Sequence, residues 1–366
     1  MRPFVRSDDA GQRWVGDVRL LPYRLPLAQI DATLAQLAQS DSFLAYDPDL
    51  GWAPRPHGHS GSGPFRVNGS GIRADDETAL VGPAGVLRIA LFGDSFTFGD
   101  EVPAEQTWAA ALARGIAARG IAAEVLNFGV NAYGTDQAYL RWQRDGRRFH
   151  PDVVIYGFQP ENVLRDLNVF RPLYFNGTEV PLSKPRVVVR DDALATVNVP
   201  TIPPADMARV LATLPDQPLL AYERYYAPWY TTRWWLHSEL AALVATLAAS
   251  HEHTLFRLDD EGSALALRIV EAFARDVHAS GAAFLVVHLP RKEDMLAQRE
   301  RRELWYGALL RAFRERFPLL SPTERAAQID DALFAPHGHY APALNAIVGE
   351  ALVDPVLAAA AARAPR

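Results

Sequence analysis

The chain has 366 residues, of which 49% are apolar and 22% charged, enough for one large domain with an insertion or for two domains. The net charge of −6 gives no basic footprint for nucleic acid, and the lack of cysteine excludes a disulfide framework, a thiol nucleophile and cysteine-bound zinc. The sequence begins without an apolar secretory segment, and no stretch approaches the about 20 apolar residues of a membrane span. We therefore expect a cytoplasmic protein without a membrane span.

The first 80 residues differ in pattern from the rest of the chain. Residues 54–64 are rich in glycine, serine, proline and histidine, have no apolar period and predict a loop. The pair Asn68-Gly69 is a turn signal and predicts a short hairpin over residues 66–73. We expect residues 1–80 to form an N-terminal extension packed on the main domain.

Strand and helix patterns alternate from residue 86 onward. Continuous apolar runs predict buried strands at 86–92, 123–128, 152–158 and, later in the chain, 282–289. Helical patterns cover residues 105–119, 135–149, 263–280, 293–317 and 341–362. Such alternation predicts an α/β fold, a three-layer α/β/α sandwich with a parallel sheet and helices on both faces.

This alternation is interrupted by residues 166–262, which are rich in proline and aromatic residues. We expect a core formed by residues 81–165 and 263–366, with 166–262 as an inserted cap. The aromatic segment 222–235 has two interpretations. Its rings either cover a site and contact a sugar or an acyl chain, or they pack in the core of the insertion, which is the more frequent role of such residues.

The sharpest motif is Gly93-Asp94-Ser95, directly after the first strand of the alternating pattern. In open parallel sheets, ligands bind at the carboxyl ends of the strands. Ser95 therefore lies where a nucleophile is expected. The alternative is a serine that only caps the following helix.

Two further polar signals follow the next two strands. Gly129 comes after the second strand and Asn162 after the third. A glycine N–H and an asparagine amide are donors suited to an oxyanion hole, although each residue is also common in ordinary loops. Because neighbouring parallel strands end at one edge of a sheet, we expect both residues to lie near Ser95.

A histidine pair stands immediately before the last predicted helix. A serine hydroxyl is a weak nucleophile and needs an adjacent base, for which histidine has a suitable pKa near neutrality. His339 is our candidate for this base, and His337 competes with it. His251 and His253 are two positions apart, which does not fit the spacing of a helical zinc site, so we expect no metal.

Taken in order, these blocks resemble the SGNH/GDSL hydrolase superfamily. The resemblance implies a flavodoxin-like α/β fold that needs no cofactor, with Ser95 as nucleophile and His339 as base. It also implies an oxyanion hole formed by the N–H groups of Ser95 and Gly129 and the side chain of Asn162. It spans residues 86–163 and 282–355, and Gly-His-Tyr before the last helix matches the family better with His339 than with His337.

The sequence departs from the family pattern in two places. Family members often carry aspartate three residues before the catalytic histidine, and Pro336 stands there. The nearest upstream acids are Asp330 and Asp331, so we expect Asp331, or alternatively Asp330, to be the third member if the loop folds back. Otherwise a backbone carbonyl or water orients the imidazole. In the third block, Val163 stands where aspartate is typical.

The expected function is that of a serine esterase or deacylase acting on an O-acyl ester of a carbohydrate or related small metabolite. An O-acyltransferase and a catalytically degenerate binding protein are the alternatives. A nucleotide-binding protein is disfavoured, because neither a Gly-x-Gly-x-x-Gly segment nor a P-loop lysine follows the first strand. Arg165 and Arg171 are candidates for binding an anionic group such as phosphate or carboxylate, or are ordinary ion-pair partners. The sequence predicts no oligomeric state.

Overall fold

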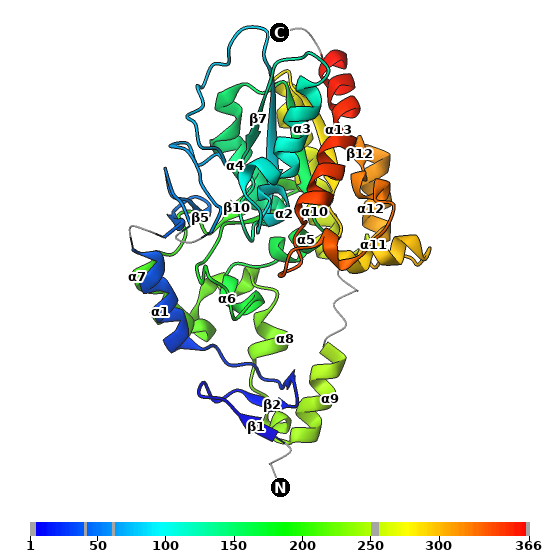
Figure 1. Cartoon of the computed structure of the whole chain (residues 1–366). Coiled ribbons are helices and arrows are strands. Elements are labelled where there is room, and N and C mark those ends of the chain that lie inside the picture. The colour runs from blue at the N-terminus through cyan, green and yellow to red at the C-terminus, as the bar shows by residue number, and fades with distance from the viewer. Residues whose placement is uncertain (1–4, 40–41, 61–62, 250–255, 364–366) are drawn as a thin grey trace.

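A computed structural model describes residues 5–39, 42–60, 63–249 and 256–363. Its centre is a five-stranded parallel sheet with the strand order β12-β11-β8-β6-β7 (Figure 1). The strands are β6 (Leu87–Gly93), β7 (Ala123–Asn127), β8 (Val153–Phe158), β11 (Ala283–His288) and β12 (Leu319–Leu320). The predicted α/β fold with a parallel sheet is confirmed. The short strand β12 lies at one edge and was not predicted from the sequence.

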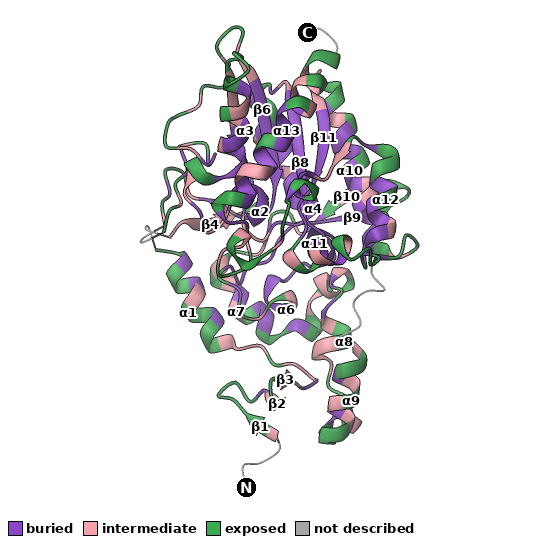
Figure 2. Ribbon diagram, turned by 45° about the vertical axis from the view of Figure 1, so that its right-hand side comes forward, coloured by how far each residue is buried: buried purple, intermediate pink, exposed green. Residues whose placement is uncertain are grey.

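Side chains alternate between the two faces of this sheet, as the two-residue period of a strand requires. Ile89 and Leu91 of β6 belong to one core cluster, whereas Ala90 and Phe92 belong to the other. Helices α3 (Trp108–Ala117) and α13 (Pro342–Ala362) cover the first face. Helices α4 (Thr135–Arg144), α10 (Glu261–Ala279) and α12 (Gly307–Arg316) cover the second. The result is a three-layer sandwich with its buried residues at the centre (Figure 2).

The last helix, α13, is long and apolar enough to cross a membrane, judged by length and composition among the described residues. The prediction that no segment has the length and composition of a membrane span is therefore wrong for residues 342–362. Leu344, Val348 and Leu352 of this helix are buried in the core cluster that also contains α3. At Gly349 a Cβ atom would lie only 2.5 Å from the Trp108 carbonyl oxygen, so glycine permits the close approach of the two helices.

The helix predicted over 293–317 is divided into α11 (Lys292–Arg299) and α12. Between them, Tyr306 is fully buried while its neighbour Trp305 is partly exposed. Arg301 has a φ of 57°, which ends the helical path. The division lets the chain turn inward at Tyr306, and the helical periodicity of the sequence does not reveal this turn.

The N-terminal extension is divided between two places. The ribbon of β4 (Leu44–Asp47) and β5 (Gly51–Pro54) packs on the core, where the indole N–H of Trp52 donates to the Asn131 carbonyl at 2.9 Å. Helix α1 (Leu27–Leu37) also joins the larger core cluster. The strands that precede it contact the insertion instead; they are β1 (Val5–Ser7), β2 (Arg13–Val15) and β3 (Val18–Arg19).

Residues 66–73 do not form the expected hairpin. Asn68 instead folds the segment around its own side chain, because its Oδ1 accepts the N–H groups of Ser70 and Ile72 at 3.0 and 3.1 Å. Such side-chain to backbone bonds compete with strand pairing. Residues 66–73 therefore contribute turns and one isolated bridge, between His59 and Arg66.

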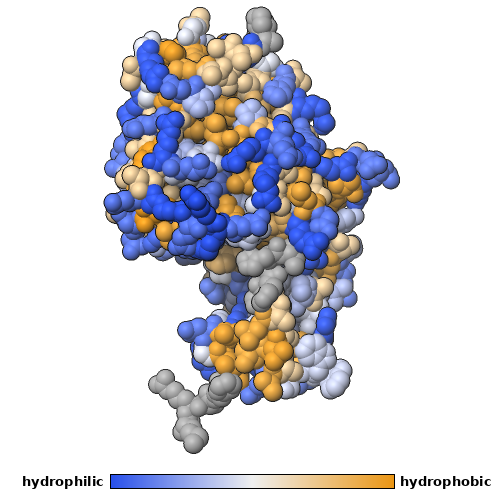
Figure 3. Space-filling model, turned by 90° about the vertical axis from the view of Figure 1, so that its right-hand side faces the viewer, coloured by the Kyte–Doolittle hydropathy of each residue, from blue (hydrophilic) through white to orange (hydrophobic). Residues whose placement is uncertain are grey.

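The insertion contains a two-stranded antiparallel ribbon and a set of short helices. Helix α5 (Glu161–Asp166) leads into it, and its elements are α6 (Arg171–Tyr174), β9 (Arg186–Arg190), β10 (Ala193–Val197), α7 (Pro204–Ala212), α8 (Tyr226–Tyr230) and α9 (Glu239–Ala249). Many of its aromatic rings pack against one another or against the N-terminal strands; Tyr174 lies 5.0 Å from Tyr225, and Trp229 stacks on Tyr23 at 5.3 Å. Apolar side chains are exposed on α9, including Leu240 and Val244 (Figure 3).

Candidate active site

The turn that carries Ser95 lies at the carboxyl end of β6. The strand ends at Gly93, and Ser95 opens the short helix α2 (Ser95–Phe98). The Oδ1 atom of Asp94 accepts the Phe96 N–H at 3.0 Å and so caps this helix. Gly93 has a φ of 155°, and a Cβ atom there would lie 2.7 Å from the Gly157 carbonyl oxygen. Glycine is thus required where the chain turns from β6 into α2, close to the end of the neighbouring strand β8.

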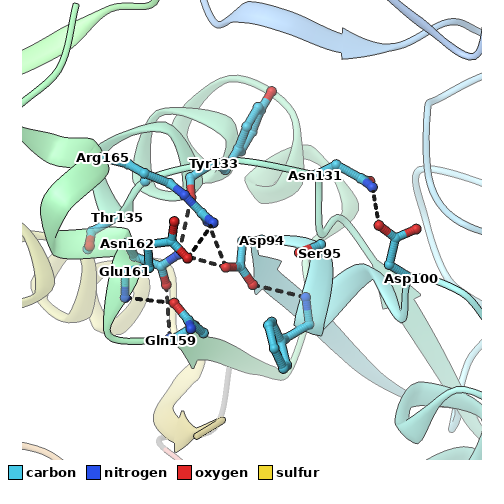
Figure 4. Close-up of polar contacts among 12 residues, drawn as sticks. Asp94, Ser95, Asp100, Asn131, Tyr133, Thr135, Gln159, Glu161, Asn162 and Arg165 are labelled. Atoms are coloured by element: carbon cyan, nitrogen blue, oxygen red, sulfur yellow. Dashed lines mark hydrogen bonds and ion pairs between the residues drawn. The ribbon is translucent and has the colours of Figure 1, made fainter. Parts of the chain in front are cut away.

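The second carboxylate oxygen of Asp94 holds this turn in place. Its Oδ2 atom accepts from Asn162 Nδ2 at 2.9 Å and from Arg165 Nη1 at 2.8 Å (Figure 4). The Asp94 side chain is fully buried, so its charge requires such partners. The contacts tie the turn after β6 to helix α5, which follows β8.

His339 approaches Ser95 from the loop before α13. Its Nε2 atom lies 2.9 Å from Ser95 Oγ, although the two residues are 244 positions apart in the sequence. The imidazole packs 5.0 Å from the ring of Phe96, and the side chain of His339 is 17% exposed. The two side chains therefore have the geometry of a nucleophile and its base.

The carboxylate next to the imidazole belongs to Glu101. Its Oε2 atom lies 2.7 Å from His339 Nδ1, and its two oxygens accept the backbone N–H groups of His337 and His339 at 2.9 and 3.2 Å. Burial raises the pKa of Glu101, but these hydrogen bonds outweigh it and hold the pKa below the ordinary value. Glu101 is therefore ionised at neutral pH and orients the imidazole from the side opposite Ser95.

The expectation for Asp331 and Asp330 is corrected by this contact. Asp331 is exposed and pairs with Lys292, which lowers the pKa of its carboxyl. Asp330 accepts the Ala332 N–H at 3.0 Å and caps a short helical turn. Neither contacts His339, because the acid is supplied by a different loop. The acidic pair Asp100-Glu101, a few residues after Ser95, is the sequence signal that could have identified it.

The competing histidine, His337, takes a different part in the site. Its side chain is exposed, and its backbone N–H donates to Glu101.

A second carboxylate, that of Asp100, faces the imidazole of His339. Asp100 Oδ2 lies 3.9 Å from His339 Nε2 and accepts from Asn131 Nδ2 at 2.7 Å. Burial raises the pKa of Asp100, and His339 opposes this effect.

Two of the three expected oxyanion donors are engaged in internal hydrogen bonds. The Gly129 N–H donates to Asn127 Oδ1 at 2.9 Å, and Asn162 Nδ2 donates both to Asp94 and to the Tyr133 carbonyl. The Ser95 N–H donates to no acceptor in the described part of the chain. At Gly129 a Cβ atom would lie 2.4 Å from the Phe98 nitrogen, so this glycine allows close packing on α2.

The two arginines singled out in the sequence have different surroundings. Arg165 lies inside the site, paired with Asp94 at 2.8 Å and with Glu161 at 3.3 Å. Arg171 is also buried, but it forms no ion pair with any described residue. No group of three potential metal ligands occurs within the described ranges, and His251 and His253 lie outside them.

The fold and the site together define an α/β protein with a serine, a histidine and a carboxylate in contact at the carboxyl edge of a parallel sheet. No protein-family model and no curated protein sequence matches the chain. Solved structures similar to it include a putative lipolytic protein of the G-D-S-L family from Desulfitobacterium hafniense, with 13% identity, a TM-score of 0.35, and coverage of 73% of this chain and 98% of that one.

Two further structures are similar to the chain. A lipase/acylhydrolase from Enterococcus faecalis has 14% identity and a TM-score of 0.39, with 77% of this chain and 99% of that one covered. An acetyl xylan esterase from Geobacillus stearothermophilus has 12% identity and a TM-score of 0.39, with 76% and 97% covered.

Proposed function

We propose that the chain is a serine esterase that cleaves an O-acyl ester through an acyl-enzyme formed on Ser95. The observation that carries the proposal is the continuous set of contacts from Ser95 Oγ to His339 Nε2 at 2.9 Å and from His339 Nδ1 to Glu101 at 2.7 Å. A hydroxyl, an imidazole and an ionised carboxylate in this order are the parts of a catalytic triad.

The reaction divides the cleavage of the ester into two steps. His339 Nε2 takes the proton of Ser95 while Oγ attacks the carbonyl carbon, and Glu101 stabilises the imidazolium that forms. The bond to the alcohol oxygen then breaks, and His339 returns the proton to that oxygen. Water, with its proton taken by His339, attacks the acyl-enzyme and releases the acid together with the free Ser95 hydroxyl.

The developing oxyanion needs hydrogen-bond donors beside Ser95. The Ser95 N–H is the donor without an internal acceptor among the described residues. Asn162 joins it only by releasing Asp94 or the Tyr133 carbonyl, which its Nδ2 contacts at 2.9 and 3.1 Å. The Gly129 N–H would have to leave Asn127, to which it donates at 2.9 Å. We therefore assign the Ser95 N–H as the first donor, which Gly129 or Asn162 joins after releasing an internal acceptor.

The proposed substrate class is an O-acyl ester of a carbohydrate or related small metabolite, whose alcohol oxygen leaves as a hydroxyl protonated by His339. Transfer of the acyl group to an acceptor hydroxyl would use the same acyl-enzyme and the same residues. A non-catalytic role was an alternative because no acid stood in the usual place before His339. The contact between Glu101 and the imidazole, at 2.7 Å, removes that reason.

The proposal is tested with p-nitrophenyl esters from acetate to octanoate. We expect turnover by the wild-type protein and a loss of about three orders of magnitude in kcat/KM for both Ser95→Ala and His339→Ala. Ser280→Ala is a matched control, because that hydroxyl only donates to the Val277 carbonyl at the end of α10. Equal turnover by the wild type and Ser95→Ala would contradict the proposal.

A further inference from the structure

Arg171 is a buried cation without a counter-ion. It is the first residue of α6, in the insertion, and its side chain and backbone together are 6% exposed. Its Nε and Nη1 atoms are buried and donate to no acceptor, and it forms no ion pair in the described part of the chain. Placing a guanidinium in this environment is unfavourable unless an anion accompanies it.

Other buried arginines nearby have such anions. Arg165 is paired with Asp94 and Glu161, and Arg186 with Glu261. Burial, together with the positive charge of Arg165, lowers the pKa of Arg171 to about 9. This value still leaves Arg171 protonated at neutral pH. The guanidinium thus carries a positive charge that forms no ion pair with a described carboxylate; the buried Glu223 accepts the N–H of the preceding residue, Phe170, at 2.9 Å.

Aromatic rings flank the Arg171 guanidinium. Its central carbon lies 5.2 Å from the centre of the Tyr174 ring and 5.6 Å from that of Phe175. The faces of these rings attract a cation, but they provide no acceptor for its N–H groups. Phe175 is 54% exposed, so one of the two rings beside the guanidinium lies at the surface of the molecule.

A continuous series of contacts connects this position with the nucleophile turn. The Tyr174 hydroxyl donates to Glu161 at 2.6 Å, Glu161 pairs with Arg165 at 3.3 Å, and Arg165 pairs with Asp94 at 2.8 Å. Asp94 directly precedes Ser95 in the sequence. This series joins Tyr174, whose ring lies beside Arg171, to the residue that precedes the nucleophile.

The charges along this series set the charge of a suitable ligand. Arg165 and Arg291 are matched by Asp94 and Glu161, because Glu161 pairs with both arginines. These four residues are neutral as a group, and Arg171 adds one positive charge. A ligand group with one negative charge balances it, whereas a phosphate monoester with two negative charges does not.

We propose that Arg171 binds a singly charged anionic group, of the carboxylate class, on the ester substrate cleaved at Ser95. The planar fork of N–H donors in a guanidinium matches the two oxygens of a carboxylate. The link to catalysis rests on the proposed esterase function, whereas the binding of the anion does not. Arg171 would make the enzyme selective for acidic esters, and Arg165 would hold the nucleophile turn.

The test uses two pairs of esters that differ in charge. Para-acetoxybenzoate and para-acetoxybenzamide place the charge on the alcohol side, and p-nitrophenyl hemisuccinate and pentanoate place it on the acyl side. We expect the wild type to prefer the acidic member of one pair. In Arg171→Met, the KM of that member should rise about 30-fold or more, while the KM of its neutral counterpart changes less than about 2-fold.

Arg186→Met is the matched control, because Arg186 is a buried arginine of the insertion that has its carboxylate partner. This variant should keep the preference for the acidic ester. Arg171→Lys retains the charge without the fork and should give an intermediate KM. Without ligand, the Tm of Arg171→Met should equal or exceed that of the wild type, since an unpaired buried charge is removed. The Tm of Arg186→Met should fall.

A binding measurement separates this inference from the esterase proposal. Calorimetry with para-acetoxybenzoate and the Ser95→Ala variant should show binding that is lost when Arg171→Met is added. If this binding is observed but the wild type turns over no ester, the proposed esterase activity is contradicted while anion binding by Arg171 is supported. The inference is overturned if the wild type prefers the acidic ester in neither pair, or if that preference persists in Arg171→Met. It is also overturned if p-nitrophenyl phosphate binds the Ser95→Ala variant more tightly than para-acetoxybenzoate does.

Discussion

Two histidines at the carboxyl edge of the same sheet have opposite surroundings. His339 lies in a loop with Ser95 on one ring nitrogen and Glu101 on the other, and its side chain is 17% exposed. His288 ends β11 and is fully buried. Its Nε2 atom lies 2.8 Å from the Tyr306 hydroxyl, and its Nδ1 atom has no partner among the described residues.

The difference shows what makes an imidazole a base in this fold. Burial lowers the pKa of His288 to about 3, because no carboxylate compensates for the loss of water around a charged ring. At His339, by contrast, the ionised carboxylate of Glu101 lies 2.7 Å from Nδ1. The position at the sheet edge is common to both residues, so the carboxylate and not the position distinguishes the candidate base.

The largest effect is expected when the carboxylate beside His339 is removed, because His339 then lacks an acidic partner, as His288 does. We expect Glu101→Gln to lower kcat/KM for p-nitrophenyl acetate by about three orders of magnitude, because an amide does not stabilise the imidazolium and can select the wrong tautomer. Asp331→Asn is the control, since Asp331 is exposed and pairs with Lys292. A rate loss in Asp331→Asn as large as that in Glu101→Gln would contradict the assignment of the acid.

A smaller effect is expected on the free energy of unfolding, through the titration of the buried His288. The pKa of His288 falls from 6.5 to about 3 on folding, so the unfolded chain binds the proton first as the pH decreases. The stability due to neutral His288 is therefore present above pH 6.5 and is lost progressively as the pH falls toward 3. Between pH 7 and pH 4 this loss should be on the order of 3 kcal/mol.

His288→Phe should remove that dependence. Urea unfolding at pH 7 and pH 4 measures it, and the free energy of unfolding should fall less in the variant than in the wild type. The esterase rate of this variant at pH 7 should remain within about 3-fold of the wild-type rate, because His288 contacts neither Ser95 nor His339. Parallel pH curves for the two proteins would show that His288 is not held neutral by the fold.

The sequence predicted the parts of the fold that depend on local pattern. Apolar runs of strand length located β6, β7, β8 and β11 to within about two residues, and the Gly93-Asp94-Ser95 motif placed a serine at the end of β6. These signals are local because a buried parallel strand is apolar along its whole length. The proximity of Ser95 and His339 followed from the block order of a known superfamily, and the structure places the two side chains in contact.

The parts that the sequence did not predict depend on contacts between loops. Glu101 was not predicted because the family pattern places the acid just before the histidine, whereas this chain supplies it from the loop that follows Ser95. The hydrogen-bond acceptors of Gly129 and Asn162 were also not predicted, because they depend on how the chain packs around α2 and on the position of the Asp94 carboxylate. No periodicity or spacing in one sequence distinguishes the paired Arg165 from the unpaired Arg171.

The measurement that tests the central claim most directly is covalent labelling with a fluorophosphonate, followed by mass spectrometry of the peptide that contains Ser95. The account predicts a single adduct on Ser95 in the wild type and in His288→Phe, and labelling slowed by several orders of magnitude in His339→Ala. A label on another residue, or equal labelling of the wild type and Ser95→Ala, would contradict it.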